Sequence, residues 1–114
     1  MIKKHFSEVE EQEVLEYGST GTSIRWLITK EKDKAPRFSL RRFEIQPGGE
    51  IGIHNHAQEH EIYILAGTGE VYTHFEINEI SKDDVLYVPP DEPHGYRNTG
   101  EENLVFLCVI PYLK

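Results

Sequence analysis

Four histidines have the spacing in this sequence that is most suggestive of chemistry. Three of them, His54, His56 and His60, lie within seven positions in the stretch GIHNHAQEHEIYILAG. Side chains alternate between the two faces of a strand, so these three imidazoles share one face and Glu59 and Glu61 point to the other. A bulge in the AQE stretch between them would weaken this argument. Because neutral imidazoles bind divalent transition metals, the spacing predicts a metal site.

The fourth histidine, His94, follows a proline-rich segment further along the chain. Pro89, Pro90 and Pro93 fix their φ angles, so the loop can hold the imidazole in one position with little entropy left to lose. Alone, His94 would be interpreted as a turn residue; as part of a set, it completes the cluster. Asn98 is expected to close a turn rather than touch the ion.

The complete pattern is Gly48-x5-His54-x-His56-x3-His60-x6-Gly67, followed by Pro89-x4-His94-x3-Asn98. It resembles the two motifs of the cupin superfamily, and the match covers about Phe38 to Pro111. A subgroup of small single-domain cupins is especially similar: it reads HxHxxEHE followed by PPxxPH, and shares the PGG turn and the FLCVIP ending. The resemblance implies an all-β jelly-roll barrel (double-stranded β-helix) and one divalent metal per chain, manganese first, with iron, nickel or zinc as alternatives. The ligands that it implies are His54, His56, His60 and His94.

The chain departs from the usual cupin motifs at two places. His60 stands where a glutamate is usual when the spacing is counted back from Gly67, although Glu61 also satisfies the looser spacing. Asp83 and Asp91 replace the glycines of the second motif. The first departure leaves the choice between His60 and Glu61 as a ligand to be tested.

The chemistry of such a site follows from its neutral ligands. Four imidazoles leave the double charge of the ion uncompensated, so the ion attracts anionic ligands and acidifies bound water. Octahedral coordination would leave two adjacent positions free, for a chelating substrate or for a substrate beside dioxygen. The same geometry suits Lewis-acid isomerisation or hydrolysis, so the ligand set does not choose the reaction. Protons are expected to compete with the metal as the pH falls.

Candidate substrate-binding residues lie on two predicted strands. Arg41 shares a face with Phe43 on the first, and its planar guanidinium matches a carboxylate; a salt bridge near a sheet edge is the alternative. Phe106, Cys108 and Ile110 share a face of the last strand and would form an apolar wall beside the metal. A buried structural role is the favoured interpretation of Cys108. His5 and His74 lack partners at ligand spacing and are expected on the surface.

Three functions remain open at this level. The leading hypothesis is a mononuclear metal-dependent oxidoreductase of dioxygenase type that acts on a small organic molecule. The second is a non-redox isomerase or lyase in which the ion polarises a carbonyl. The third is a protein that binds a small ligand, or senses it, without turnover.

The elements that must position these residues are short and almost all β. Runs of β-branched and aromatic residues alternate with Gly, Pro, Asn and Asp turns, and no helix is long enough to connect parallel strands. We expect one domain over residues 1–114, with a solvated, irregular or helical N-terminal arm over 1–22, a barrel core over 23–111, a charged loop at Lys30–Pro36 and a turn at Pro47–Gly49. The predicted strands are Ser23–Thr29, Phe38–Ile45, Glu50–His56, His60–Ala66, Glu70–Phe75, Ile77–Ile80, Val85–Val88, Gly95–Arg97 and Leu104–Ile110.

Composition limits the possible partners. The 114 residues carry a formal net charge of -8, which repels phosphate backbones and anionic membranes, so neither nucleic acid nor a membrane is expected as a partner. No run approaches the roughly 20 apolar residues of a membrane span. The single cysteine, Cys108, is consistent with a reducing cytoplasmic location. Both faces of Leu104–Ile110 are apolar, which predicts a homodimer.

Overall fold

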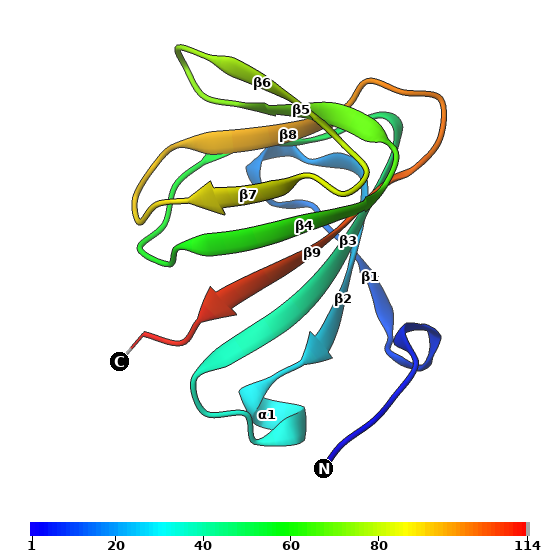
Figure 1. Ribbon diagram of the computed structural model, residues 1–114, viewed down its shortest axis with the longest axis vertical. Helices are drawn as coiled ribbons and strands as arrows, with labels where there is room; N and C mark the ends of the chain where they lie inside the picture. The colour runs from blue at the N-terminus through cyan, green and yellow to red at the C-terminus, as the bar shows by residue number, and fades with distance from the viewer. Residues whose placement is uncertain (114) are drawn as a thin grey trace.

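The computed structural model describes residues 1–113, and a single curled sheet of nine strands dominates it (Figure 1). The strand order is β6-β5-β8-β3-β9-β4-β7, with β2 pairing β3 and β1 pairing β2. The sheet curls into a jelly-roll barrel, as the sequence predicted. The elements are η1 (Phe6–Glu8), β1 (Glu11–Glu13), η2 (Glu16–Gly18), β2 (Thr20–Ile28), α1 (Lys30–Asp33), β3 (Phe38–His54), β4 (His60–Ala66), β5 (Thr68–Tyr72), β6 (Ile77–Ser81), β7 (Val85–Val88), β8 (His94–Asn98) and β9 (Leu104–Pro111).

Strand β3 holds the two sides of the barrel together. Its first half, Phe38–Ile45, pairs with β9, and its second half pairs with β8. Two strands separated by a turn at Pro47–Gly49 were predicted here, but the structure has one strand of 17 residues. The PGG stretch bends the strand instead of reversing it: Gly48 takes φ +79°, and the pairing with β2 shifts register close by.

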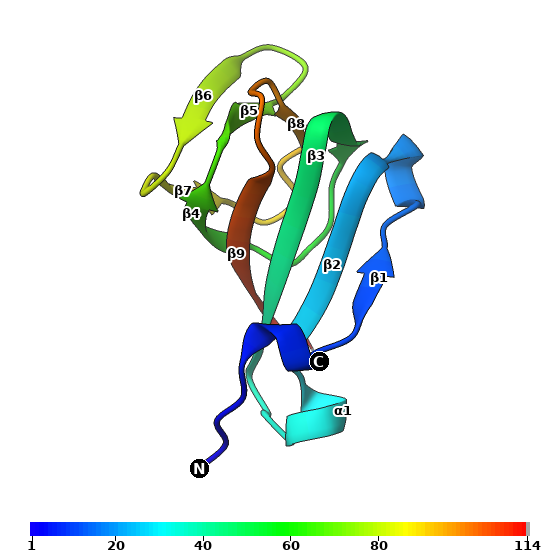
Figure 2. The same cartoon turned by 90° about the vertical axis from the view of Figure 1, so that its right-hand side faces the viewer.

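The core lies between the two sides of the curl (Figure 2). Inward positions alternate along the strands, as the period of two requires: Phe43 and Ile45 on β3 are buried, and so are Ile62 and Ile64 on β4. Phe106 on β9 stacks on Phe43, with ring centroids 5.2 Å apart. The face of Phe38–Ile45 that carries Arg41 and Phe43 is therefore the inward one.

The N-terminal arm is not solvated throughout. β1 pairs with β2 in antiparallel register, from Glu11 opposite Arg25 to Glu13 opposite Ser23. Val9 and Val14 are 7% and 8% exposed, so two apolar side chains and an edge of backbone hydrogen bonds fix the segment to the barrel. An edge strand needs few apolar residues. This explains why the segment has too few of them to form the apolar stripe of an amphipathic helix.

Other boundaries differ by a few residues from those predicted. Val85–Val88 is confirmed, but β5 ends at Tyr72, because the Thr73 hydroxyl accepts hydrogen bonds from the amides of Phe75 and Glu76 and closes a turn. The predicted loop at Lys30–Pro36 contains one helical turn, α1, which the Thr29 side chain caps. Over residues 1–113 no helix has the length and apolar character to cross a membrane.

Candidate metal site

The four cluster histidines stand at the ends of strands on one side of the barrel. His54 is the last residue of β3, while His60 and His94 are the first residues of β4 and β8. His56 follows β3 in the loop that leads to β4, two residues beyond the observed end of the strand. In Figure 1 these strand ends meet at the left of the view, where β7 ends and β8 begins.

Two backbone features bring the second motif to the first. β3 and β8 pair so that His54 lies directly opposite His94. In the proline-rich loop, the amide of Asp91 donates to the carbonyl of His56 at 2.8 Å. Asp91 and Asp83 have φ +64° and +74°, the left-handed region that favours glycine and that aspartate tolerates better than most residues. This explains how aspartates fill the glycine positions of the usual motif.

The imidazoles converge on a common point. One ring nitrogen from each of His54, His56 and His94 lies within 4.8 Å of the others. The Nε2 atoms of His56 and His60 are 2.7 Å apart. Two ring nitrogens bonded at about 2.1 Å to one ion, at a right angle, would be separated by roughly 3 Å, so this spacing suits a shared ion.

Three of the rings are oriented by backbone carbonyls. The Nδ1 atoms of His54, His56 and His94 lie 2.8 Å from the carbonyls of Gly52, Gln58 and Glu92 respectively. Because a carbonyl only accepts, each Nδ1 carries the proton and each Nε2 keeps its lone pair for a ligand role. The Nε2 of His94 is buried and has no hydrogen-bond partner within the described chain. A buried acceptor left in this way fits a bound cation, so these residues are suited to hold a metal.

His60 is held differently. Its Nδ1 lies 3.2 Å from Nη2 of Arg41 and 3.0 Å from the sulfur of Cys108. A guanidinium only donates, so Nδ1 of His60 accepts and the proton of the neutral ring sits on Nε2, directed at His56. Ligation through Nε2 of His60 requires this proton to leave or to move to Nδ1.

Burial keeps three rings of the cluster, those of His54, His60 and His94, uncharged. Burial, followed by the charge of Arg41, lowers the pKa of His60 to about 2. Burial also lowers the pKa of His94 to about 4, against the opposing effect of the hydrogen bond that its ring donates to the Glu92 carbonyl, and lowers the pKa of His54. These rings are therefore neutral near pH 7, which is the state that binds a metal.

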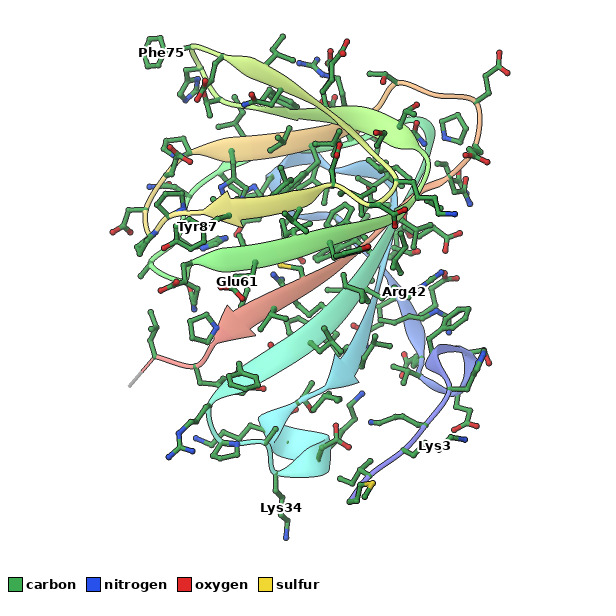
Figure 3. The ribbon with its side chains drawn as sticks, in the orientation of Figure 1. Lys3, Lys34, Arg42, Glu61, Phe75 and Tyr87 are labelled. Carbon is green, nitrogen blue, oxygen red and sulfur yellow. The ribbon has the colours of Figure 1, made fainter. Side chains whose placement is uncertain are left out.

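Glu61, the alternative ligand, points away from the cluster. It is exposed on the outer face of β4, opposite Tyr87 of β7, as Figure 3 shows. His60 beside it is only 4% exposed. His60 and Glu61 therefore lie on opposite faces of β4, as the alternation of side chains along a strand predicted. His5 and His74 are exposed, and Asn98 closes the β8–β9 loop through hydrogen bonds to Ile45, Glu102 and Gly100.

A cavity of about 300 Å³ opens beside the histidines. Of the predicted substrate-binding residues, Arg41, Phe106 and Cys108 line it, but Ile110 does not. Ile110 is one inward position beyond Cys108 on β9, roughly 7 Å further along the strand. It packs against the core instead, and its prediction as a cavity wall is wrong.

Several lining residues were not predicted from the sequence. Tyr96 is two residues beyond His94 on β8, so its inward direction follows from the same alternation. Trp26 is opposite Arg41 in the β2–β3 register, which the sequence alone does not give. Tyr17 comes from the N-terminal segment: its ring stacks on His54, with centroids 4.1 Å apart and planes at 7°. The full lining is Gln12, Glu13, Val14, Glu16, Tyr17, Ile24, Trp26, Arg41, Phe43, Ile51, His54, His56, His60, Tyr96, Phe106 and Cys108.

Comparison with known proteins agrees with this geometry. The family model of the Cupin domain, Cupin_2, matches residues 41–110. The chain belongs to the cupin family. It is 35% identical over 96 residues to an oxalate-binding protein of Thermotoga maritima, a match that covers 82% of this chain and 78% of that protein.

Two solved structures superpose closely on this chain. The polyketide cyclase RemF from Streptomyces resistomycificus has a TM-score of 0.90 and 34% sequence identity, over 97% of this chain and 79% of that one. A predicted oxalate decarboxylase from Thermotoga maritima has a TM-score of 0.86 and 28% identity, over 98% of this chain and 100% of that one. The protein is thus a small cupin with a histidine cluster that can bind a metal ion.

Proposed function

We propose that this cupin is a mononuclear metal-dependent oxidoreductase of dioxygenase type that acts on a small organic molecule. The observation that carries the proposal is the convergence of His54, His56 and His94 beside a cavity of about 300 Å³. One divalent ion would be held by His54, His56 and His94, and by His60 once its Nε2 has lost the proton. Manganese is the first candidate for this ion, and iron, nickel and zinc are the alternatives. When bound, the ion supplies Lewis acidity and, for manganese or iron, a redox centre.

The residues around the cluster set what the cavity admits. Trp26, Phe43 and Phe106 supply aromatic walls, which exclude water from the space beside the ion. The carboxylates in the lining are Glu13 and Glu16, which belong to the exposed N-terminal segment. These two are the only carboxylates among the lining residues that the structure describes. An isomerase depends on a general base more than oxygen chemistry at an ion does, which favours the oxidoreductase.

A non-redox reaction is the second candidate, and one observation favours it. The similarity to the polyketide cyclase extends over 97% of this chain. The names of the polyketide cyclase and of the oxalate-binding protein both refer to organic molecules rich in oxygen. A bound ion would polarise the oxygen atoms of such molecules. Here Tyr96, which lines the cavity, would donate a hydrogen bond to the bound molecule.

Oxygen dependence separates the two candidates. The experiment measures consumption of dioxygen and of a panel of 2-oxo acids, 1,3-diketones and catechols, with protein loaded with manganese or with zinc. Dioxygen uptake in step with loss of one compound, with manganese but not with zinc, supports the oxidoreductase. Turnover that zinc also supports under anaerobic conditions overturns it and supports the non-redox enzyme.

A further inference from the structure

His60 lacks the backbone carbonyl that orients the other three rings of the cluster. Each of those rings donates from Nδ1 to a carbonyl, which leaves its Nε2 free for an ion. Among the described residues, Nδ1 of His60 instead contacts two side chains, Nη2 of Arg41 at 3.2 Å and the sulfur of Cys108 at 3.0 Å. These two groups therefore decide which nitrogen of the His60 ring carries the proton.

Arg41 favours the state of this ring that cannot bind an ion. A guanidinium has hydrogen-bond donors and no acceptor, so it stabilises His60 with a bare Nδ1 and a proton on Nε2. That Nε2 lies 2.7 Å from Nε2 of His56, on the side where the imidazoles converge. For His60 to become a ligand, Nε2 must lose its proton and Nδ1 must gain one. Arg41 has no acceptor for the Nδ1–H group that results.

The sulfur of Cys108 is the acceptor that the second state needs. A thiol sulfur accepts hydrogen bonds, and this one lies 3.0 Å from both Nδ1 of His60 and Nη2 of Arg41. It can therefore accept from the ring and from the guanidinium together. The pairing of β4 with β9 fixes its position, because Cys108 lies opposite Ile62, the next buried residue after His60. His60 and Cys108 are 4% and 1% exposed, so bulk water does not take the place of the sulfur.

We infer that Cys108 is a positioning residue for the fourth ligand: its sulfur accepts the Nδ1–H of His60 when Nε2 binds the ion. The inference rests on the proposed metal site. The ring is neutral in both states, because Nε2 gives one proton to solvent while Nδ1 takes one from solvent, and the thiol keeps its own proton. Cys108 thus does for His60 what a carbonyl does for each of the other rings. Without this acceptor the site keeps the three ligands His54, His56 and His94.

The test compares two substitutions of nearly equal size that differ in the acceptor. Cys108→Ser keeps a hydroxyl oxygen at this position, and Cys108→Ala removes the acceptor. Zn²⁺, which is diamagnetic and so permits NMR, is the probe. Its affinity is measured by competition with a chelator at about pH 8, where free histidines are neutral.

The control is Ile62→Val, which trims the buried residue opposite Cys108 and removes no polar group. Circular dichroism and unfolding in denaturant establish that each protein is folded. Cys108→Val replaces Cys108→Ala if that variant does not fold, because valine also lacks an acceptor.

The expected effect on affinity depends on the acceptor and on His60. Cys108→Ala weakens Zn²⁺ binding by about tenfold or more, and Cys108→Ser and Ile62→Val weaken it by less than about threefold. In a His60→Gln background, Cys108→Ala changes the Zn²⁺ affinity no further, because the ligand that it positions is already absent. A residue with only a packing role would weaken binding in both backgrounds.

NMR reads the position of the proton directly. Long-range proton–nitrogen spectra of the zinc-loaded wild type, assigned with His60→Gln, are expected to show the proton of the His60 ring on Nδ1. The spectra of zinc-loaded Cys108→Ala are expected to show it on Nε2.

The role of the sulfur and the metal site fail in different ways. No loss of affinity in Cys108→Ala, equal losses in Cys108→Ala and Cys108→Ser, or an undiminished effect in the His60→Gln background would overturn the role of the sulfur. So would a His60 proton on Nε2 in the zinc-loaded wild type. The metal site would stand in each of these cases. If the wild type binds no Zn²⁺, the metal site itself is overturned, and the positioning role with it.

Discussion

At the scale of single residues, three imidazoles share one means of orientation. His54, His56 and His94 each lie within 2.8 Å of a carbonyl two residues away along the chain. The partner is thus local, so the tautomer is set as soon as the loop or strand end forms. His60 alone depends on residues distant in sequence, Arg41 and Cys108.

The lowered pKa values predict that the metal-free protein is sensitive to acid. Between pH 6.5 and about 4 the unfolded chain protonates its histidines while His60 and His94 stay neutral in the folded state. The unfolded state binds more protons in this range, so the free energy of unfolding falls as the pH falls. We expect the unfolding temperature of the metal-free protein to drop by roughly 5 °C or more from pH 7 to pH 5. His60→Gln should show a shallower drop; an identical slope in this variant would contradict the interpretation.

The single cysteine gives a second prediction at this scale. Cys108 is 1% exposed, and burial raises the pKa of its thiol, which disfavours the reactive thiolate. A water-soluble disulfide reagent should modify the native protein roughly 100-fold more slowly than the protein in denaturant. Equal rates in both conditions would mean that the sulfur is accessible and that the wall of the cavity is open at Cys108.

At the scale of elements, η2 packs against the last part of β3 at Gly52. A Cβ at Gly52 would collide with the carbonyl oxygen of Tyr17, whose ring stacks on His54. Gly52→Ala should therefore displace the segment and cost roughly 1–3 kcal/mol of stability in denaturant unfolding. Tyr17 itself has φ +60°, so this close approach holds a strained residue in place.

A neighbouring glycine provides the control for this steric effect. A Cβ at Gly18 would meet nothing within 4 Å, although its φ of +68° disfavours a side chain. Gly18→Ala should cost only about 1 kcal/mol, from backbone strain alone. Equal losses in the two variants would show that contact between Gly52 and Tyr17 does not determine where the segment lies.

The sequence allowed much of this architecture to be predicted, because strand alternation is a local property. A period of two placed Arg41 with Phe43 on one face, Phe106 with Cys108 on another, and Glu61 on the face opposite His60. Which face is the inward one came from the structure. The continuity of β3 through Pro47–Gly49 did not follow from the sequence, since Pro-Gly-Gly suits a turn as well as a bend. Nor did the position of Tyr17, which depends on contacts between segments remote in the sequence.

At the scale of the whole molecule, the outer face of β4, β7 and β9 is apolar. Tyr63, Val85 and Tyr87 are 43%, 70% and 57% exposed there, beside Leu107 and Val109 of β9. Figure 3 shows Tyr87 and Glu61 on this face, on neighbouring strands. The homodimer that the sequence predicts would cover it with a second copy of the chain.

Sedimentation equilibrium tests the homodimer. We expect a dimer for the wild type and a rise of about tenfold or more in the dissociation constant for Val85→Glu, which places a charge on the exposed edge strand β7. Ile77→Glu, on the separate β5–β6 hairpin, is the control and should leave the dimer intact. A monomeric wild type at all concentrations, or weakening by the control alone, would contradict the prediction.

The most direct test of the whole interpretation is elemental analysis of untagged protein purified without added metal or chelator. We expect about one divalent metal ion per chain in the wild type, Glu61→Ala and His74→Ala, and a loss of at least about tenfold in His94→Ala and in His54→Ala. Full metal content in both histidine variants, or metal lost from Glu61→Ala but kept by His60→Ala, would contradict an imidazole centre at this end of the barrel.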